Sequence, residues 1–155
     1  MIKATESLTG KPVPLTEYKL ARKDLYVKSA NLSAAFERMT SEPKSKQRNI
    51  KDLHKFVVLN HILSSYIATV AGEVTMKPDY KARPEAIKLI RKSLALLNES
   101  IKKLGGTKVE FYDDKTTLLL EEKPGSVNDA LLKEQLEYIN KISVDITKVT
   151  DAVLK

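Results

Sequence analysis

The chain has 155 residues, of which 42% are hydrophobic and 30% charged, and its 27 Lys and Arg against 20 Asp and Glu give a formal net charge of +7. This size and composition suit one globular domain with a hydrophobic core and exclude an intrinsically disordered chain. The absence of cysteine excludes a disulfide framework and a thiolate metal site, and the low numbers of glycine (5) and proline (6) favour long helices over many turns.

The first fifteen residues predict an extended tether. Pro12 and Pro14 hold the backbone outside the helical region and remove two amide donors. No apolar segment of a signal peptide follows Met1. The expected organisation is therefore a tether over residues 1–15 and one helical domain over residues 16–155.

A first long helix is expected over residues 16–41. Thr16 can cap its start, and apolar residues recur through the segment at helical spacing. Pro43 predicts its end, because a proline ring excludes the preceding residue from helical backbone angles. The apolar stripe comprises Tyr18, Leu25, Leu32, Phe36 and Met39.

A second helix is expected over residues 50–74, with Asn49 as its cap. It is apolar around so much of its circumference that we expect it to lie centrally in the fold. Its uncharged run, residues 56–72, is interrupted by polar residues and is short for a membrane span. Asn60 falls inside the apolar stripe and should need a hydrogen-bond partner there.

A third helix is expected over residues 84–104, with Pro84 in its first turn and two glycines, Gly105 and Gly106, after its end. Its apolar residues alternate at steps of three and four. The following residues 107–125 show no clear period, and an irregular excursion and a short β-hairpin both remain open.

The last helix is expected over residues 127–153, where apolar residues repeat every seven positions as in a coiled-coil seam. Together the segments predict an all-α fold, an antiparallel bundle of four long helices with a variable loop or short hairpin before the last one. The residues expected in its core are Leu25, Leu32, Phe36, Leu63, Ile67, Leu94, Leu97, Ile139 and Ile146.

Positive charge is concentrated in two segments. Residues 44–55 carry five Lys and Arg and one Asp, a local charge of +4, and residues 77–103 carry eight Lys and Arg and three acids, a local charge of +5. An anionic partner, such as nucleic acid, lipid headgroups or an acidic protein surface, would fit this distribution, and so would a solvated lysine-rich surface.

No arrangement typical of catalysis or cofactor binding stands out. His54 and His61 are seven residues apart, about 10 Å along one helix, which is too far to hold one metal ion without further ligands. The carboxylate pairs at 113–114 and 121–122 lie in the irregular segment and are expected to be solvated. We therefore expect no enzyme, no metal and no cofactor. Nucleic-acid binding is disfavoured, because the basic loop is rich in lysine rather than arginine and aromatic residues are scarce.

One segment carries a family resemblance. In Tyr18–Gln47, YKLARKDLYVKSANLSAAFERMTSEPKSKQ, an Ala-Arg pair is followed by Ala-Asn-Leu, Ala-Ala-Phe, Arg-Met and Glu-Pro. This order resembles the segment after the last membrane span in FUSC-type (fusaric-acid-resistance-like, YccS-like) bacterial inner-membrane proteins. The resemblance covers these 30 residues and is not a catalytic signature.

The resemblance implies the cytosolic domain of an efflux transporter, acting as an assembly or regulatory module on the cytoplasmic side of the bacterial inner membrane. A basic domain agrees with the positive-inside rule. The expected partner is the transmembrane part of the parent protein, which this chain lacks, and a homo-oligomer is a further option. The alternative, from another class, is a soluble basic helical protein that binds nucleic acid.

Seven polar residues are the candidates for interaction. Four belong to the resemblance and flank the apolar stripe of the first helix, and three lie in the loop that follows. Because that loop lies one helix length, about 40 Å, from the tether, we expect direct lipid contact to be weak or absent. The candidates are Arg22, Asn31, Arg38, Glu42, Lys44, Lys46 and Arg48.

Overall fold

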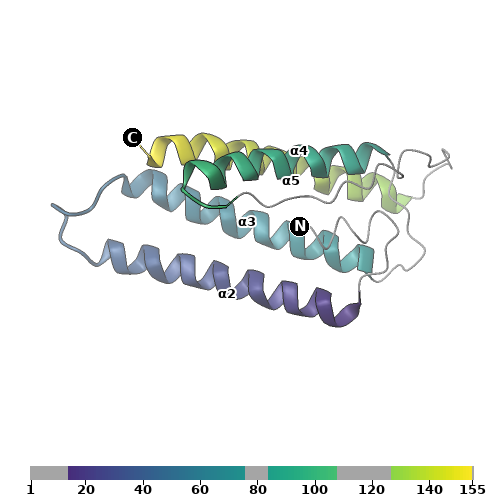
Figure 1. Ribbon diagram of the computed structural model, residues 1–155, viewed down its shortest axis with the longest axis horizontal. Helices are drawn as coiled ribbons and strands as arrows, with labels where there is room; N and C mark the ends of the chain where they lie inside the picture. Colours follow the sequence, from purple (N-terminus) through teal and green to yellow (C-terminus); the bar gives the residue numbers. More distant parts are fainter. Residues whose placement is uncertain (1–13, 76–83, 108–126, 155) are drawn as a thin grey trace.

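The computed structural model describes residues 14–75, 84–107 and 127–154, and these form an all-α bundle (Figure 1). Its helices are α2 (Leu15–Thr40), α3 (Ile50–Thr75), α4 (Pro84–Lys103) and α5 (Val127–Val153). Each helix begins and ends within one residue of its predicted limits, so the predicted all-α bundle is confirmed. Residues 108–126, with the open choice between loop and hairpin, and residues 1–13 of the predicted tether lie outside the described residues.

The first helix begins differently from the prediction. Pro14 occupies the N-cap position with φ −55° and ψ 135°, and no side chain caps the helix, so Thr16 as N-cap is wrong. The fixed φ of proline already suits the start of a helix. At the other end, the hydroxyls of Thr40 and Ser41 donate to the carbonyl of Glu37 at 2.8 and 2.9 Å. The helix stops ahead of Pro43, as predicted.

The helices form layers, with α3 between α2 on one side and α5 on the other, while α4 packs mainly on α5 (Figure 1). This arrangement confirms the central position predicted for the second helix. Asn60 on α3 is half-buried and donates to the carbonyl of Phe56 at 2.8 Å, so its predicted need for a partner is also met. The main buried cluster is Leu63, Val70, Val74, Ala86, Ile87, Ile90, Leu132, Leu136, Ile139, Ile142 and Ile146.

The core is smaller on the α2 side than predicted. Leu63, Ile139 and Ile146 are buried as expected, and the predicted core residues of α4, together with Ile67, are half-buried against them. Helix α2, all of whose residues are described, has no buried side chain. Burial of Leu25, Leu32 and Phe36 was therefore wrongly predicted, because α2 packs mainly on one neighbour, α3, and stays open on its other sides.

Helices α4 and α5 run in the same direction (Figure 1). Asn140 contacts Ser93 and Thr147 contacts Ser100, and 47 residues separate each pair. The predicted antiparallel order therefore holds for α2–α3 and α3–α5 but is wrong for α4–α5. The cause is the length of the connection: residues 104–126 are long enough to carry the chain back along the roughly 30 Å of α4.

One described helix, α3, also has the length and mean hydropathy of a candidate membrane span. Core helices of water-soluble proteins meet the same criterion. In this bundle α3 contributes Leu63, Val70 and Val74 to the buried cluster that it forms with α4 and α5.

Candidate functional site

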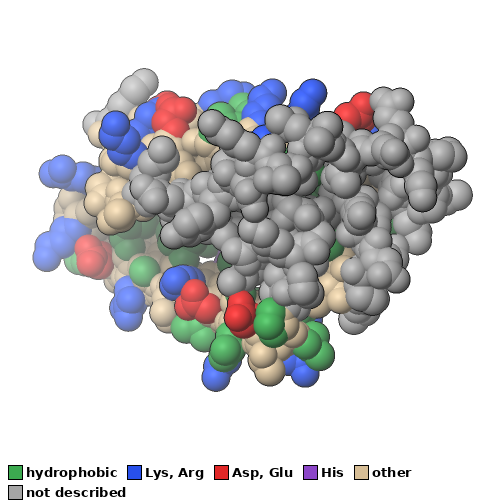
Figure 2. Space-filling view, turned by 45° about the vertical axis from the view of Figure 1, so that its right-hand side comes forward, with side chains coloured by type: hydrophobic (Ala, Val, Ile, Leu, Met, Phe, Trp, Pro, Cys, Tyr) green, Lys and Arg blue, Asp and Glu red, His purple; other side chains and the backbone are tan. Residues whose placement is uncertain are grey.

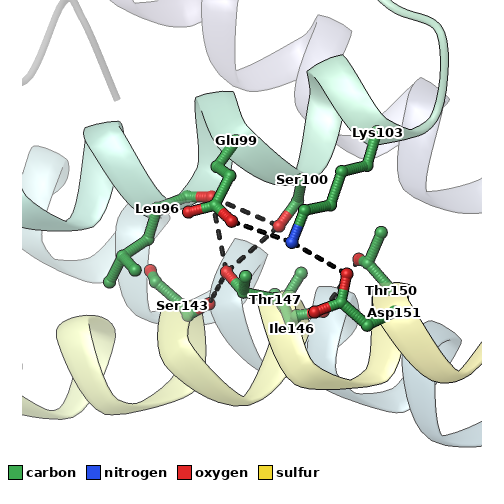
Figure 3. A network of polar contacts seen from close by, with 9 residues as sticks. All are labelled: Leu96, Glu99, Ser100, Lys103, Ser143, Ile146, Thr147, Thr150 and Asp151. Carbon is green, nitrogen blue, oxygen red and sulfur yellow. Dashed lines mark hydrogen bonds and ion pairs between the residues drawn. The ribbon is translucent and has the colours of Figure 1, made fainter.

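Small polar residues line the contact between α4 and α5, and the sequence analysis missed them. Ser93, Ser100, Ser143 and Thr150 are at most 3% exposed. The hydroxyls of Ser100 and Thr147 lie 3.1 Å apart between the helices (Figure 3). Ala86, Ser93 and Ser100 recur every seven residues, and this spacing of small residues was the available signal that two helices approach closely.

These buried hydroxyls are already satisfied. Each can donate to the carbonyl four residues earlier in its own helix, as Ser143 does to Ile139 at 2.8 Å and Thr150 to Ile146 at 2.8 Å. A buried hydroxyl donor needs only one acceptor, and each of these hydroxyls has one. None of them therefore needs a hydrogen bond to a ligand. The polar α4–α5 contact therefore serves the packing of the two helices and fixes their register.

An ion-pair cluster closes one end of this contact. The Nζ of Lys103 lies 2.8 Å from a carboxylate oxygen of Asp151 and 2.8 Å from one of Glu99 (Figure 3). The hydrogen bond to Asp151, followed by the one to Glu99, raises the pKa of Lys103 above its usual value. A cation in the last turn of α4 is also favoured by the helix dipole.

The four candidates from the family resemblance do not form one cluster. Arg22 lies over the ring of Tyr26, 5.5 Å from its centroid, and donates to the Tyr26 hydroxyl at 3.4 Å, which raises the pKa of Arg22. Arg38 is sixteen residues further on, about 160° around the same helix. Asn31 is exposed, and Glu42 lies beyond the helix end. The four residues were predicted to flank the apolar stripe, and they do not come together in one site.

One side of α2 faces away from α3 and carries exposed apolar residues. Leu20 is 66% and Val27 49% exposed. At 100° per residue, they share an arc of about 60° with Asn31, Ala34 and Arg38, all of them exposed. We call these five residues the outer α2 face. It combines two of the predicted interaction residues, Asn31 and Arg38, with the most exposed large apolar side chains of α2 away from its ends.

The connection between α2 and α3, residues 41–49, has a defined conformation. The side-chain amide of Gln47 donates to the carbonyls of Thr40 and Glu42 at 2.8 and 2.7 Å, and the amide of Lys46 donates to Pro43 at 2.8 Å. We call this connection the basic loop, because it carries Lys44, Lys46 and Arg48. These three are exposed, and among the described residues no ion pair engages them.

The last residue of the basic loop joins it to the far end of the chain. Asn49 has a φ of 50°, a left-handed conformation that asparagine tolerates better than most residues. Its side-chain amide donates to the carbonyl of Val153 at 3.3 Å. Its own carbonyl accepts from the amide of Leu53 at 2.9 Å, which places it at the predicted start of α3.

The two histidines hold α2 against α3. The ring of His61 has Ser29 Oγ at 3.0 Å from Nδ1 and Ser33 Oγ at 2.5 Å from Nε2. His54 packs on Phe36 with ring centroids 5.6 Å apart. Both ring nitrogens of His61 thus have partners. Within the described residues, no group of three or more His, Cys, Asp or Glu could hold a metal ion.

An apolar pocket lies where α2, α3, α5 and the end of α4 converge. Its volume is about 200 Å³. Nine of its ten lining residues are apolar, and the tenth is Thr150, whose hydroxyl is bonded to its own helix. The lining residues are Leu32, Ala35, Phe36, Met39, Leu53, Phe56, Val57, Leu104, Thr150 and Val153. We call this cavity the apolar pocket.

Comparison with protein-family models, with curated proteins and with solved structures finds no match to this chain. The family resemblance of Tyr18–Gln47 therefore stays a prediction. In the structure, this segment comprises α2 after its first turn and most of the basic loop.

Proposed function

We propose that this chain is the cytoplasmic helical module of a FUSC-type bacterial inner-membrane efflux transporter, and that it serves assembly or regulation rather than catalysis. The outer α2 face supports this proposal most directly. Asn31, Ala34 and Arg38 belong to the segment that resembles the family, and all three point away from the core of the bundle. The packing of this chain alone does not require those residue types.

The chemistry of the outer α2 face suits a protein partner. Exposed apolar side chains are typical of association surfaces when they lie close together, and on this face Leu20 and Val27 are about two helical turns apart. Leu20 and Val27 supply apolar area, and Ala34 lets another helix approach closely. Arginine is enriched in protein interfaces, and Arg38 lies on the same arc. The expected partner is the membrane part of the parent protein or a second copy of the module.

Two experiments test the proposal. The coding sequence upstream of residue 1 is expected to encode several apolar spans in the same reading frame. A cysteine introduced by Val27→Cys is the only cysteine of the chain, because the native sequence has none. In cells that express the parent protein with this substitution, it should cross-link to the membrane part of that protein or to a second copy of the module.

The matched control is Lys92→Cys, at an exposed position on α4. We expect it to cross-link much less than Val27→Cys. A reading frame without spans would contradict the membrane assignment. Equal cross-linking at both positions, or none at either, would contradict the role of the outer α2 face.

Nucleic-acid binding remains the second candidate, because the three cations of the basic loop have no ion-pair partner among the described residues. Against it, α2 and α3 lie side by side and antiparallel (Figure 1), whereas the helices of a helix-turn-helix cross at a steep angle. An electrophoretic mobility shift that weakens steeply with salt, and that is lost when the loop is neutralised, would favour this candidate over the first.

A further inference from the structure

We propose that the apolar pocket binds the alkyl chain of a single-chain anionic amphiphile, and that the basic loop holds its charged head group. This inference is independent of the proposed function. It rests on the lining of the pocket, on its size and on the cations beside it, which form no ion pair with any described residue.

The described residues that line the pocket offer no free group that would recognise a polar ligand atom. The hydroxyl of Thr150, its one polar side chain, donates to the carbonyl of Ile146 at 2.8 Å. The part of a ligand that enters the pocket must therefore be apolar, because an unpaired polar group there would lose its hydration without compensation.

The size of the pocket limits the ligand to one chain. A cavity of about 150 Å³ in another protein holds benzene, with six carbon atoms, so the 200 Å³ here has room for about eight. A helix of a partner protein or the two chains of a phospholipid would not fit. The wall formed by α2 can adjust to a ligand at low cost, since α2 has no buried side chain.

The basic loop borders the pocket. It connects two of the lining residues, Met39 at the end of α2 and Leu53 in α3. The hydrogen bond from Asn49 to Val153, a third lining residue, holds the loop against the end of α5. Figure 2 shows Lys and Arg side chains, with an acidic one among them, beside hydrophobic surface at its left-hand end, the end at which Figure 1 shows this connection.

The charge at this end favours an anion. Between Ser41 and Asp52 the chain carries four cations, Lys44, Lys46, Arg48 and Lys51, against two acids, Glu42 and Asp52, a net charge of +2. The N-terminus of α3, which follows the loop, adds the positive end of a helix dipole. A further acid, Asp151 on α5, is paired with Lys103. An alkyl chain with an anionic head therefore matches both the pocket and its surroundings.

The test measures binding of sodium decanoate to the whole chain by titration calorimetry, at concentrations below micelle formation. We expect one site per chain, and binding at least about tenfold tighter than that of decyltrimethylammonium, which has an alkyl chain one carbon longer and the opposite charge. Amide shifts in NMR spectra should centre on α2, α3 and the end of α5.

Two pairs of variants locate the site. Ala35→Leu fills the pocket and should weaken decanoate binding about tenfold, whereas Ala34→Leu, on the outer α2 face, should leave it unchanged. Replacing Lys44, Lys46 and Arg48 together by Gln should weaken binding by a similar factor. The control replaces Lys88, Lys92 and Lys141, which are exposed on α4 and α5, and so removes the same charge elsewhere.

Several results would overturn the proposal. Equal affinity for the anion and the cation would show that the loop does not select the head group. Equal effects of Ala35→Leu and Ala34→Leu would place the alkyl chain outside the pocket. Association only above the micelle concentration, or only with anionic vesicles, would show that the chain recognises an assembled surface and not a single amphiphile. Circular dichroism of each variant checks that the fold is retained.

Discussion

The hydroxyl of Ser100 on α4 lies 3.1 Å from the hydroxyl of Thr147 on α5, 47 residues further along the chain. The same separation joins Ser93 to Asn140, and a separation of 48 joins Glu85 to Lys133 and Lys103 to Asp151. A constant separation means that the two helices run parallel and keep one register along their contact. Small side chains at this contact allow the two backbones to lie close together.

The first prediction concerns this close contact. Ser93 is completely buried, so Ser93→Leu should force α4 and α5 apart and lower the free energy of unfolding by about 1–3 kcal/mol. Ser65→Leu is the matched control, because Ser65 is exposed on α3 and should change stability by less than about 0.5 kcal/mol. Urea unfolding followed by circular dichroism measures both. Equal losses would mean that the contact is not tightly packed.

The helices and their limits could be predicted because each relies on local signals. Apolar spacing, Pro43 after α2 and the glycines after α4 act over a few residues. The direction of α5 could not be predicted in the same way, because it depends on a long connection whose path the sequence does not specify. Burial along α2 was overestimated for a related reason: a stripe shows which side of a helix packs, but not how many neighbours cover it.

The candidate sites also differ in whether a local sequence pattern could predict them. The basic loop was visible as a run of lysines, whereas the apolar pocket was not, because its lining residues come from three helices and from the turn after α4. The role of His61 depends on Ser29 and Ser33, which lie on a different helix. Pairings of this kind are set by the packing of α2 on α3, and no local pattern encodes them.

The second prediction compares the two sides of the bundle. Ile139 is buried between three helices, so Ile139→Ala should cost about 2–5 kcal/mol. Leu25 on α2 is only half-buried, and Leu25→Ala should cost clearly less. Chemical denaturation gives both values, and native-state hydrogen exchange should show the amides of α2 exchanging before those of α5. A cost below about half a kcal/mol for Ile139→Ala would contradict the assigned core.

The third prediction concerns Asn31. Its side chain is exposed on the outer α2 face, so Asn31→Ala removes no buried hydrogen bond and should shift the free energy of unfolding by less than about 0.5 kcal/mol. Its effect should appear instead as weaker cross-linking from Val27→Cys. A loss of more than about 1 kcal/mol in the isolated chain would show that Asn31 serves the fold itself.

The fourth prediction concerns pH. The contacts of Lys103 with Asp151 and Glu99 raise its pKa in the folded chain above the ordinary 10.5. Because the folded state binds this proton more tightly, the stabilisation is complete below the unfolded pKa and is lost as pH rises through the folded pKa. Lys103→Gln should therefore lower the thermal midpoint at pH 7–9, with the difference from the native chain vanishing in strong alkali.

Lys102→Gln is the control for this prediction. Lys102 is exposed in the same last turn of α4, and its removal takes away the same charge. Added salt should reduce the difference between the two variants, because the pairs of Lys103 are exposed to solvent. Identical midpoints for both variants at pH 7 and low salt would show that the Lys103 pairs add nothing beyond the interaction of a cation with the helix end.

The last prediction concerns the membrane. If the chain follows a membrane span, as we propose, its first helix starts near the bilayer. Helix α2 is 26 residues long, so the basic loop lies about 40 Å from that start, several Debye lengths at physiological salt. We therefore expect the isolated chain to co-sediment weakly or not at all with anionic vesicles at physiological salt. Binding of one amphiphile in the apolar pocket agrees with this, because it needs no bilayer. Tight and salt-sensitive sedimentation, abolished when Lys44, Lys46 and Arg48 are replaced by Gln, would instead show that the bundle lies flat on the membrane surface.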